Sequence, residues 1–152
     1  MVAQALKKVL KANYVEKQEL DVTSPSSVKK AFNKFKPKKV IHLAAFTNVD
    51  LSEQKKMEAF KVNVVGTKNV CLACKKFGCH LTFVSTDGVF DGKKGDYKES
   101  DETNPINYYG KTKVLGEKIV LKTLPGNSAV IRIAYPFGKS EKSNLLKWVV
   151  AK

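Results

Sequence analysis

The chain has 152 residues, of which 43% are apolar and 28% charged, so its size and composition predict one globular domain with its own core. No apolar run approaches the roughly 20 residues that a membrane helix needs, and lysines interrupt the apolar positions near the N-terminus where a signal peptide would lie. We therefore expect a cytoplasmic protein without a membrane partner.

The net charge of +14 comes almost entirely from lysine, since Arg132 is the only arginine. Lysine pairs are spread along the chain and form no basic tail, which is typical of a solvated surface. The alternative, a nucleic-acid-binding surface, would favour arginine forks and exposed aromatic residues among the basic positions. We expect no nucleic-acid partner, although this charge should attract anionic nucleotides in a salt-dependent way.

The N-terminal quarter of the chain predicts two helices. Apolar residues recur at helical spacing from Val2 and end near Asn13. Residues 14–19 are a poor strand candidate because they are few and charged. A cap and proline signal at residues 23–26 then predicts a second helix, which stops at Pro37.

Three apolar runs predict buried parallel strands, and they are residues 39–45, 81–85 and 129–133. The spacing between them predicts a long helical region over 52–76, a glycine-rich loop from Gly88 to Tyr97 and a helix over 105–124. A final helix is expected over 144–151. Strands that alternate with helices in this way predict an α/β fold with a doubly wound, Rossmann-like parallel sheet.

Three cysteines lie close together in the sequence and allow two interpretations. Cys71, Cys74 and Cys79, followed by His80, could be read as a zinc cluster. However, Cys71 and Cys74 follow the apolar spacing of the long helical region, and free cysteine behaves as a small apolar residue. We therefore predict buried thiols and no metal site.

Polar residues follow the predicted strands, at the sheet edge where doubly wound folds bind their ligands. Ser85 and Thr86 end the second strand, and Tyr109 and Lys113 lie four residues apart on one face of the next helix. A phenol has an ordinary pKa of about 10, and a lysine one turn away would lower it. Either hydroxyl could hold a carbonyl oxygen toward the phenol, so the arrangement predicts proton transfer to an oxygen as hydride reaches its carbon.

Tyr-x-x-x-Lys alone is a weak signal in a lysine-rich chain, but three longer stretches match a known pattern. They are S-T-D-G-V-F-D-G at residues 85–92, Y-K-E-S-D at 97–101 and N-P-I-N-Y-Y-G-K-T-K-V-L-G-E at 104–117. These stretches, together with residues 20–23, 42–50 and 62–67, resemble the extended short-chain dehydrogenase/reductases, and within them the dTDP-4-dehydrorhamnose reductase group. The resemblance covers nearly the whole chain.

The resemblance implies a reductase that uses NADPH or NADH to reduce the C4 ketone of a dTDP-linked 4-keto-6-deoxy sugar. In this chemistry Tyr109 is the general acid, Lys113 lowers its pKa and holds the nicotinamide ribose, and Thr86 positions the carbonyl. The other residues that the resemblance implies at the cofactor are Asp21 by the adenine, Ala44, Ala45 and Thr47 along the groove, Asn63 on the neighbouring helix, and Ser85.

The sequence also departs from that family. It begins at what resembles the helix after the glycine-rich pyrophosphate turn, so we expect the first strand to be missing and the sheet incomplete, with a homo-oligomer completing it. Gly88 stands where the family usually has tyrosine, and we expect the C-terminal substrate lobe of the family to be missing after Trp148. We therefore expect residues 1–152 to form a single truncated NAD(P)-binding domain with impaired activity. The alternative is a non-catalytic nucleotide-binding subunit that resembles the regulatory subunit of methionine adenosyltransferase.

Overall fold

A three-stranded parallel sheet forms the centre of the computed structural model, which describes residues 2–134. Strand β1 (Lys39–His42) pairs with β2 (His80–Thr86), and β2 pairs with β3 (Ser128–Ile133). The predicted final helix over 144–151 lies outside the described residues.

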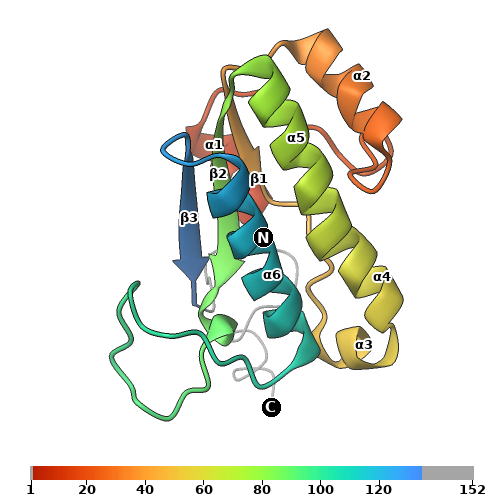
Figure 1. Ribbon diagram of the computed structural model, residues 1–152. Coiled ribbons are helices and arrows are strands. Elements are labelled where there is room, and N and C mark those ends of the chain that lie inside the picture. Colours follow the sequence, from red (N-terminus) through yellow and green to blue (C-terminus); the bar gives the residue numbers. More distant parts are fainter. Residues whose placement is uncertain (1, 135–152) are drawn as a thin grey trace.

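Helices connect the strands in the pattern of consecutive β-α-β units. The described helices are α1 (Val2–Val9), α2 (Pro25–Phe35), α3 (Val49–Gln54), α4 (Lys56–Phe60), the π-helix η1 (Lys61–Gly66), α5 (Thr67–Phe77), the 3-10 helix η2 (Asp87–Val89) and α6 (Tyr108–Thr123). In Figure 1, α5 and α6 cross in front of the sheet, whereas α1 is drawn behind it. This arrangement confirms the predicted α/β, Rossmann-like parallel sheet.

The N-terminal elements agree with their capping signals. The Ser24 side chain accepts a hydrogen bond from the Ser27 amide at 3.3 Å, and Pro25 is the first residue of α2. Lys36 ends α2 in the left-handed region at φ 42°, directly before Pro37. Helix α1 ends at Val9, four residues earlier than Asn13, and the weak strand candidate that follows it is not a strand.

The predicted helical region over 52–76 is interrupted twice. Lys55 adopts a non-helical conformation between α3 and α4, and η1 separates α4 from α5 with a π-turn. Single π-turns inside helices often occur at functional sites. Here the π-turn contains Asn63, which the sequence predicts as a site residue.

The prediction of a strand over 39–45, buried on both faces, is wrong in its length and its burial. Strand β1 has four residues, of which only His42 is buried, and 40% of the Ile41 surface is exposed. The cause is one-sided packing: α5 contacts one face of β1, and within residues 2–134 no strand pairs with its outer edge. Completion of the sheet by a second copy stays a prediction.

The core lies between the sheet and α5 and α6. Leu81 and Phe83 of β2 are fully buried there, together with the three cysteine side chains. Burial raises the pKa of Cys71 and of Cys74 to about 12, so both remain thiols. The prediction of buried thiols is confirmed, and among the described residues no group of three or more histidine, cysteine or acidic side chains could hold a metal ion.

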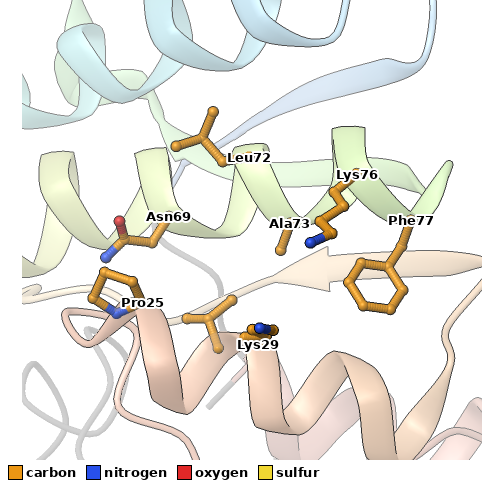
Figure 2. A pocket seen from close by; sticks show the side chains of 8 residues that line it. Pro25, Lys29, Asn69, Leu72, Ala73, Lys76 and Phe77 are labelled. Carbon is orange, nitrogen blue, oxygen red and sulfur yellow. The ribbon is translucent and has the colours of Figure 1, made fainter.

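Two further surface properties concern possible partners. Figure 2 shows a shallow groove of about 170 Å³ between α2 and α5, with Pro25 and Lys29 on one helix and Leu72 and Phe77 on the other. None of its lining residues belongs to the predicted site. Among residues 2–134, no helix combines the length and apolar character that a membrane crossing requires.

Candidate active site

Helix α6 begins at the carboxyl end of β2, and two acceptors fix its first turn. The Asn107 side chain accepts a hydrogen bond from the Gly110 amide at 2.7 Å. Glu53 of α3 accepts one from the Tyr108 amide at 2.6 Å. Because both bonds end in the turn that carries Tyr109, they hold this tyrosine at the strand end.

The same turn lies unusually close to the segment that follows β2. A Cβ atom added at Gly110 would lie 2.3 Å from the carbonyl oxygen of Gly88 and 2.8 Å from the Cβ atom of Pro105. Only glycine permits this approach, since real Cβ contacts essentially never fall below 3.0 Å. Gly110 therefore allows Tyr109 to lie beside the residues of the strand end.

The structure brings Tyr109 together with Thr86 and Asp87. Tyr109 is partly buried, and this burial, with the nearby Asp87 carboxylate, raises the pKa of its phenol, while the Thr86 hydroxyl acts in the opposite direction. From the helical spacing, the sequence predicts that Lys113 lowers the pKa of the Tyr109 phenol. In this structure Lys113 is not a cause of the shift, and Tyr109 is a protonated phenol at neutral pH.

Lys113 points into the protein. Its ammonium group donates a hydrogen bond to the carbonyl oxygen of Val84 at 2.7 Å and lies 4.0 Å from the ring centroid of Phe83. Only 2% of its surface is exposed, and this burial lowers the pKa of Lys113 to about 8, although Glu117 raises it. The amine is thus a buried cation at neutral pH, one turn from Tyr109.

The two candidate hydroxyls at the end of β2 have separate partners. Ser85 is buried and donates a hydrogen bond to Glu117 at 2.5 Å, on the face of β2 that packs against α6. Thr86 follows it and is only partly buried, in contact with Asp87 and the Gly88 amide. Of the two hydroxyls, the one that contacts the Tyr109 phenol is that of Thr86.

Asn63 connects the loop after β1 with α6. Its side-chain oxygen accepts a hydrogen bond from the Phe46 amide at 2.7 Å, and its amide group donates to the Phe46 carbonyl at 3.1 Å and to Thr112 at 2.9 Å. Thr112 in turn donates to the carbonyl oxygen of Tyr109 at 2.7 Å. Asn63 thereby holds the loop after β1 close to the turn of α6 that carries the tyrosine.

The remaining predicted cofactor residues lie in two places. Ala44, Ala45 and Thr47 flank Phe46 in the loop that Asn63 holds, so the structure places them near α6. Asp21 instead precedes α2, where its carboxylate accepts hydrogen bonds from the amide and hydroxyl of Thr23. Its described contacts do not include Tyr109 or Thr86, and its role by an adenine stays a prediction.

Three polar residues near the site are absent from the predictions, and of these His42 and Glu117 are buried and Arg132 is partly buried. His42 bonds with Thr67 at 3.2 Å, and burial, reinforced by Lys113, lowers its pKa to about 3, so the imidazole is neutral. Glu117 and Arg132 form an ion pair with an Nη2 to Oε2 distance of 2.7 Å. Only Arg132 carried a signal in the sequence, as the sole arginine; the two partners lie 15 residues apart and meet through tertiary packing.

Comparison with known proteins identifies the family of this chain. The family model described as the RmlD substrate binding domain matches residues 1–152, the full length of the chain. The chain belongs to this family. One relative of this RmlD-family chain is the dTDP-4-dehydrorhamnose reductase of Aggregatibacter actinomycetemcomitans, 40% identical over 122 residues, which are 80% of this chain and 41% of the relative.

Two other matches extend the comparison. Methionine adenosyltransferase 2 subunit beta of Xenopus tropicalis is 38% identical over 123 residues, which are 81% of this RmlD-family chain and 36% of that protein. The crystal structure of dTDP-4-dehydrorhamnose reductase from Bacillus anthracis in complex with NADP has a TM-score of 0.90 and 32% identity, and the match covers 97% of this chain and 54% of that one. The chain thus spans less than half the length of the two curated relatives and about half the length of the crystallised reductase.

Proposed function

We propose that this chain carries the proton-donating half of a nucleotide-sugar reductase. The reaction is the reduction of the C4 ketone in a dTDP-linked 4-keto-6-deoxy sugar with NADPH or NADH. The observation that carries the proposal is the protonated Tyr109 phenol, which lies beside Thr86 and one helical turn from the buried ammonium group of Lys113. Relatives that are named reductases, at up to 40% identity, support the substrate class.

Two features support a nicotinamide nucleotide as the cofactor. The Lys113 ammonium has three N–H donors, and only the one on Val84 has a described acceptor, so the others would be available to ribose hydroxyls once the ammonium turns toward Tyr109. The loop held by Asn63 carries the small side chains of Ala44 and Ala45, which leave room for a flat ring system. When bound, the cofactor would supply the hydride.

The chain's own residues would manage the proton. Thr86 would hold the carbonyl oxygen of the substrate toward Tyr109, and the phenol would donate its proton to that oxygen. The phenolate that remains would be stabilised by the positive charge of Lys113, provided that the ammonium moves from Val84 toward the ring. Asn63, through its hydrogen bond to Thr112, would keep Tyr109 at a fixed position relative to the loop after β1.

Replacement of Tyr109 by phenylalanine tests this role. We expect Tyr109→Phe to lower the rate of dTDP-4-dehydrorhamnose reduction by about 10²- to 10⁴-fold, the contribution of a general acid. Titration with NADPH and NADH, followed by fluorescence, should give the same affinity as before the substitution. The matched control is Tyr108→Phe, because the Tyr108 side chain lies one position away and its amide alone is used in the cap. Equal losses in the two variants would contradict the role of Tyr109.

The non-catalytic alternative, a regulatory subunit, has relatives of similar identity among the methionine adenosyltransferase subunits. The site geometry favours the reductase, because a binding role alone does not require a phenol and a buried ammonium group one helical turn apart, with the hydroxyl of a strand end beside the phenol. Measurable reduction by the unmodified protein distinguishes the two functions.

A further inference from the structure

Arg132 is the only arginine among 28 basic residues, and its contacts indicate why an arginine and not a lysine stands at this position. From β3 its guanidinium group forms a fork on Glu117, with Nε 3.1 Å from Oε1 and Nη2 2.7 Å from Oε2. Only 5% of the Glu117 side chain is exposed. Lysine offers a single ammonium group and cannot make this planar, two-bond contact, so the site requires arginine in a chain that otherwise uses lysine.

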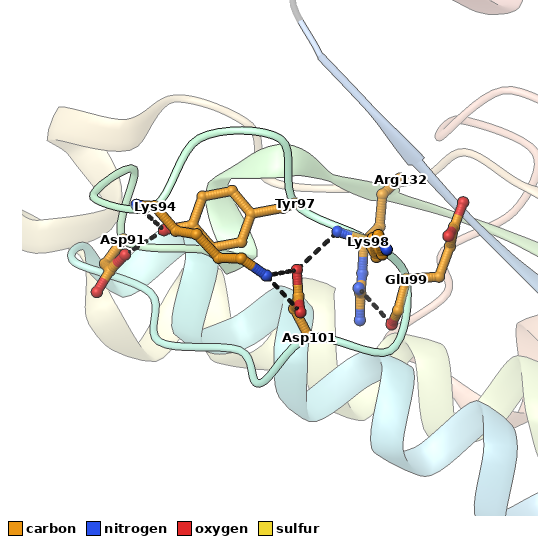
Figure 3. Close-up of polar contacts among 7 residues, drawn as sticks. All are labelled: Asp91, Lys94, Tyr97, Lys98, Glu99, Asp101 and Arg132. Carbon is orange, nitrogen blue, oxygen red and sulfur yellow. Dashed lines mark hydrogen bonds and ion pairs between the residues drawn. The ribbon is translucent and has the colours of Figure 1, made fainter.

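The rest of the guanidinium group contacts the loop that follows strand β2. Its Nη1 atom donates a hydrogen bond to the Glu99 carbonyl oxygen at 3.2 Å, and its central carbon lies 4.9 Å from the ring centroid of Phe90. Phe90 stacks on Tyr97 with 4.3 Å between ring centroids and 14° between ring planes. One side chain therefore touches both ends of residues 90–99, and Figure 3 shows Arg132 beside Glu99.

The other described side-chain bonds in this region are formed within residues 91–104. Tyr97 donates to Asp91, and Lys94 forms an ion pair with Asp101 at 2.8 Å, as Figure 3 shows. These bonds shape the loop but do not attach it to the sheet or to α6. A hollow of about 620 Å³ lies on this segment, and Asp91, Tyr97 and Asn104 are among its lining residues.

We propose that Arg132 is a positioning residue, which fastens loop 90–99 to the buried Glu117 carboxylate and so makes the loop a fixed wall beside Thr86 and Tyr109. The loop begins four residues after Thr86, and the amide of Asn104 closes its base on the Val89 carbonyl at 2.9 Å. The attachment itself follows from the contacts of Arg132. The role of the loop as a wall for the nucleotide sugar rests on the proposed function.

The first experiment measures the attachment in the absence of any ligand. Amide hydrogen exchange is compared in the unmodified protein, in Arg132→Lys, and in the control Lys118→Gln, which changes an exposed residue adjacent to Glu117. We expect Arg132→Lys to speed exchange at Lys98 and Asn104 by about tenfold or more, the effect of losing charge-assisted hydrogen bonds. The amide of Phe83 in β2 should keep its rate, and the control should match the unmodified protein.

Two results would overturn the proposal. Unchanged exchange at Lys98 and Asn104 would mean that the loop does not depend on the fork. An equal rise at Phe83 would mean that Arg132 stabilises the whole fold and has no particular effect on the loop. Both results are independent of catalysis, so they remain distinct from a failure of the proposed function.

The second experiment concerns the substrate and uses the same variants with dTDP-4-dehydrorhamnose and NADPH. Because Arg132 does not belong to the Thr86 and Tyr109 pair, we expect Arg132→Lys to raise KM for the nucleotide sugar about tenfold and to change kcat much less. A fall in kcat with an unchanged KM would contradict the role as a substrate wall. If the unmodified protein shows no turnover, the proposed function fails, and the exchange result still decides the attachment.

Discussion

Lys113 carries a positive charge into the interior, and its pKa describes the energetic consequence. The pKa falls from the ordinary value of 10.5 to about 8 because burial disfavours the charged form. Between about pH 8 and pH 10.5, Lys113 is therefore protonated in the unfolded chain but largely unprotonated in the folded protein. Folding stability then rises with pH across this range, and below about pH 8 the buried charge destabilises the fold by about 3 kcal/mol.

Replacement of Lys113 by methionine tests whether the buried positive charge lowers the stability of the fold. We expect Lys113→Met to raise the free energy of unfolding by about 1–3 kcal/mol near neutral pH, because it removes a desolvated charge and keeps the side-chain length. The rise in stability between about pH 8 and pH 10 should disappear in this variant. Lys111→Met, on an exposed position of the same helix, serves as the control. Urea unfolding at several pH values provides the measurement, and a loss of stability in Lys113→Met would contradict the interpretation.

The N-terminal turn of α6 packs directly against the segment after β2, and the backbones meet at Gly110 and Gly88. A methyl group at Gly110 would collide with the Gly88 carbonyl, whereas one at Gly88 would meet Thr86 only at 3.4 Å. We expect Gly110→Ala to lower the free energy of unfolding by about 1–3 kcal/mol and Gly88→Ala to change it by less than about 0.5 kcal/mol. Chemical denaturation of both variants measures the difference. Similar stabilities would mean that the contact relaxes easily.

Element boundaries that depend on local chemistry were predictable from the sequence. Ser24 and Pro25 start α2, and Gly78 ends α5 in the left-handed region at φ 68°. Boundaries that depend on distant contacts were not predictable. The shortness of β1 reflects pairing on one edge only, and the π-turn around Asn63 is accompanied by hydrogen bonds to Phe46 and Thr112, which lie far away in the sequence.

The same distinction applies to the candidate site. The spacing of Tyr109 and Lys113 and the polar end of β2 could be read directly, because one helix and one strand contain them. The hydrogen bond from Ser85 to Glu117 could not be predicted, because it depends on the orientation of β2 relative to α6. The pKa of Tyr109 was predicted in the wrong direction because the position of the Lys113 ammonium, on the Val84 carbonyl, is a matter of tertiary structure.

At the scale of the whole molecule, the net charge of +14 opposes folding through mutual repulsion of the lysines. The ion pairs of residues 2–134 other than that of Arg132 involve exposed lysines, such as Lys7 with Glu16, and such pairs contribute little stability. Screening of the repulsion should therefore outweigh screening of these attractions.

Added salt should accordingly stabilise the protein. We expect the free energy of unfolding in urea to rise by about 1 kcal/mol as sodium chloride increases from about 0.02 M to about 0.2 M. Sodium bromide should give the same gain, because screening depends on ionic strength and not on the identity of the anion. A decrease in stability with salt would show that the local ion pairs outweigh the net repulsion.

The π-turn of η1 has a consequence for the alignment of related sequences. A π-turn contains one residue more than the α-helical path that it replaces, and each helical residue accounts for about 100° of rotation. A homologue with one residue fewer between Lys61 and Gly66 would form an uninterrupted helix, in which the residue aligned with Asn63 points away from the loop after β1. An alignment gap in these six positions would thus mark a homologue whose loop after β1 is held by other means.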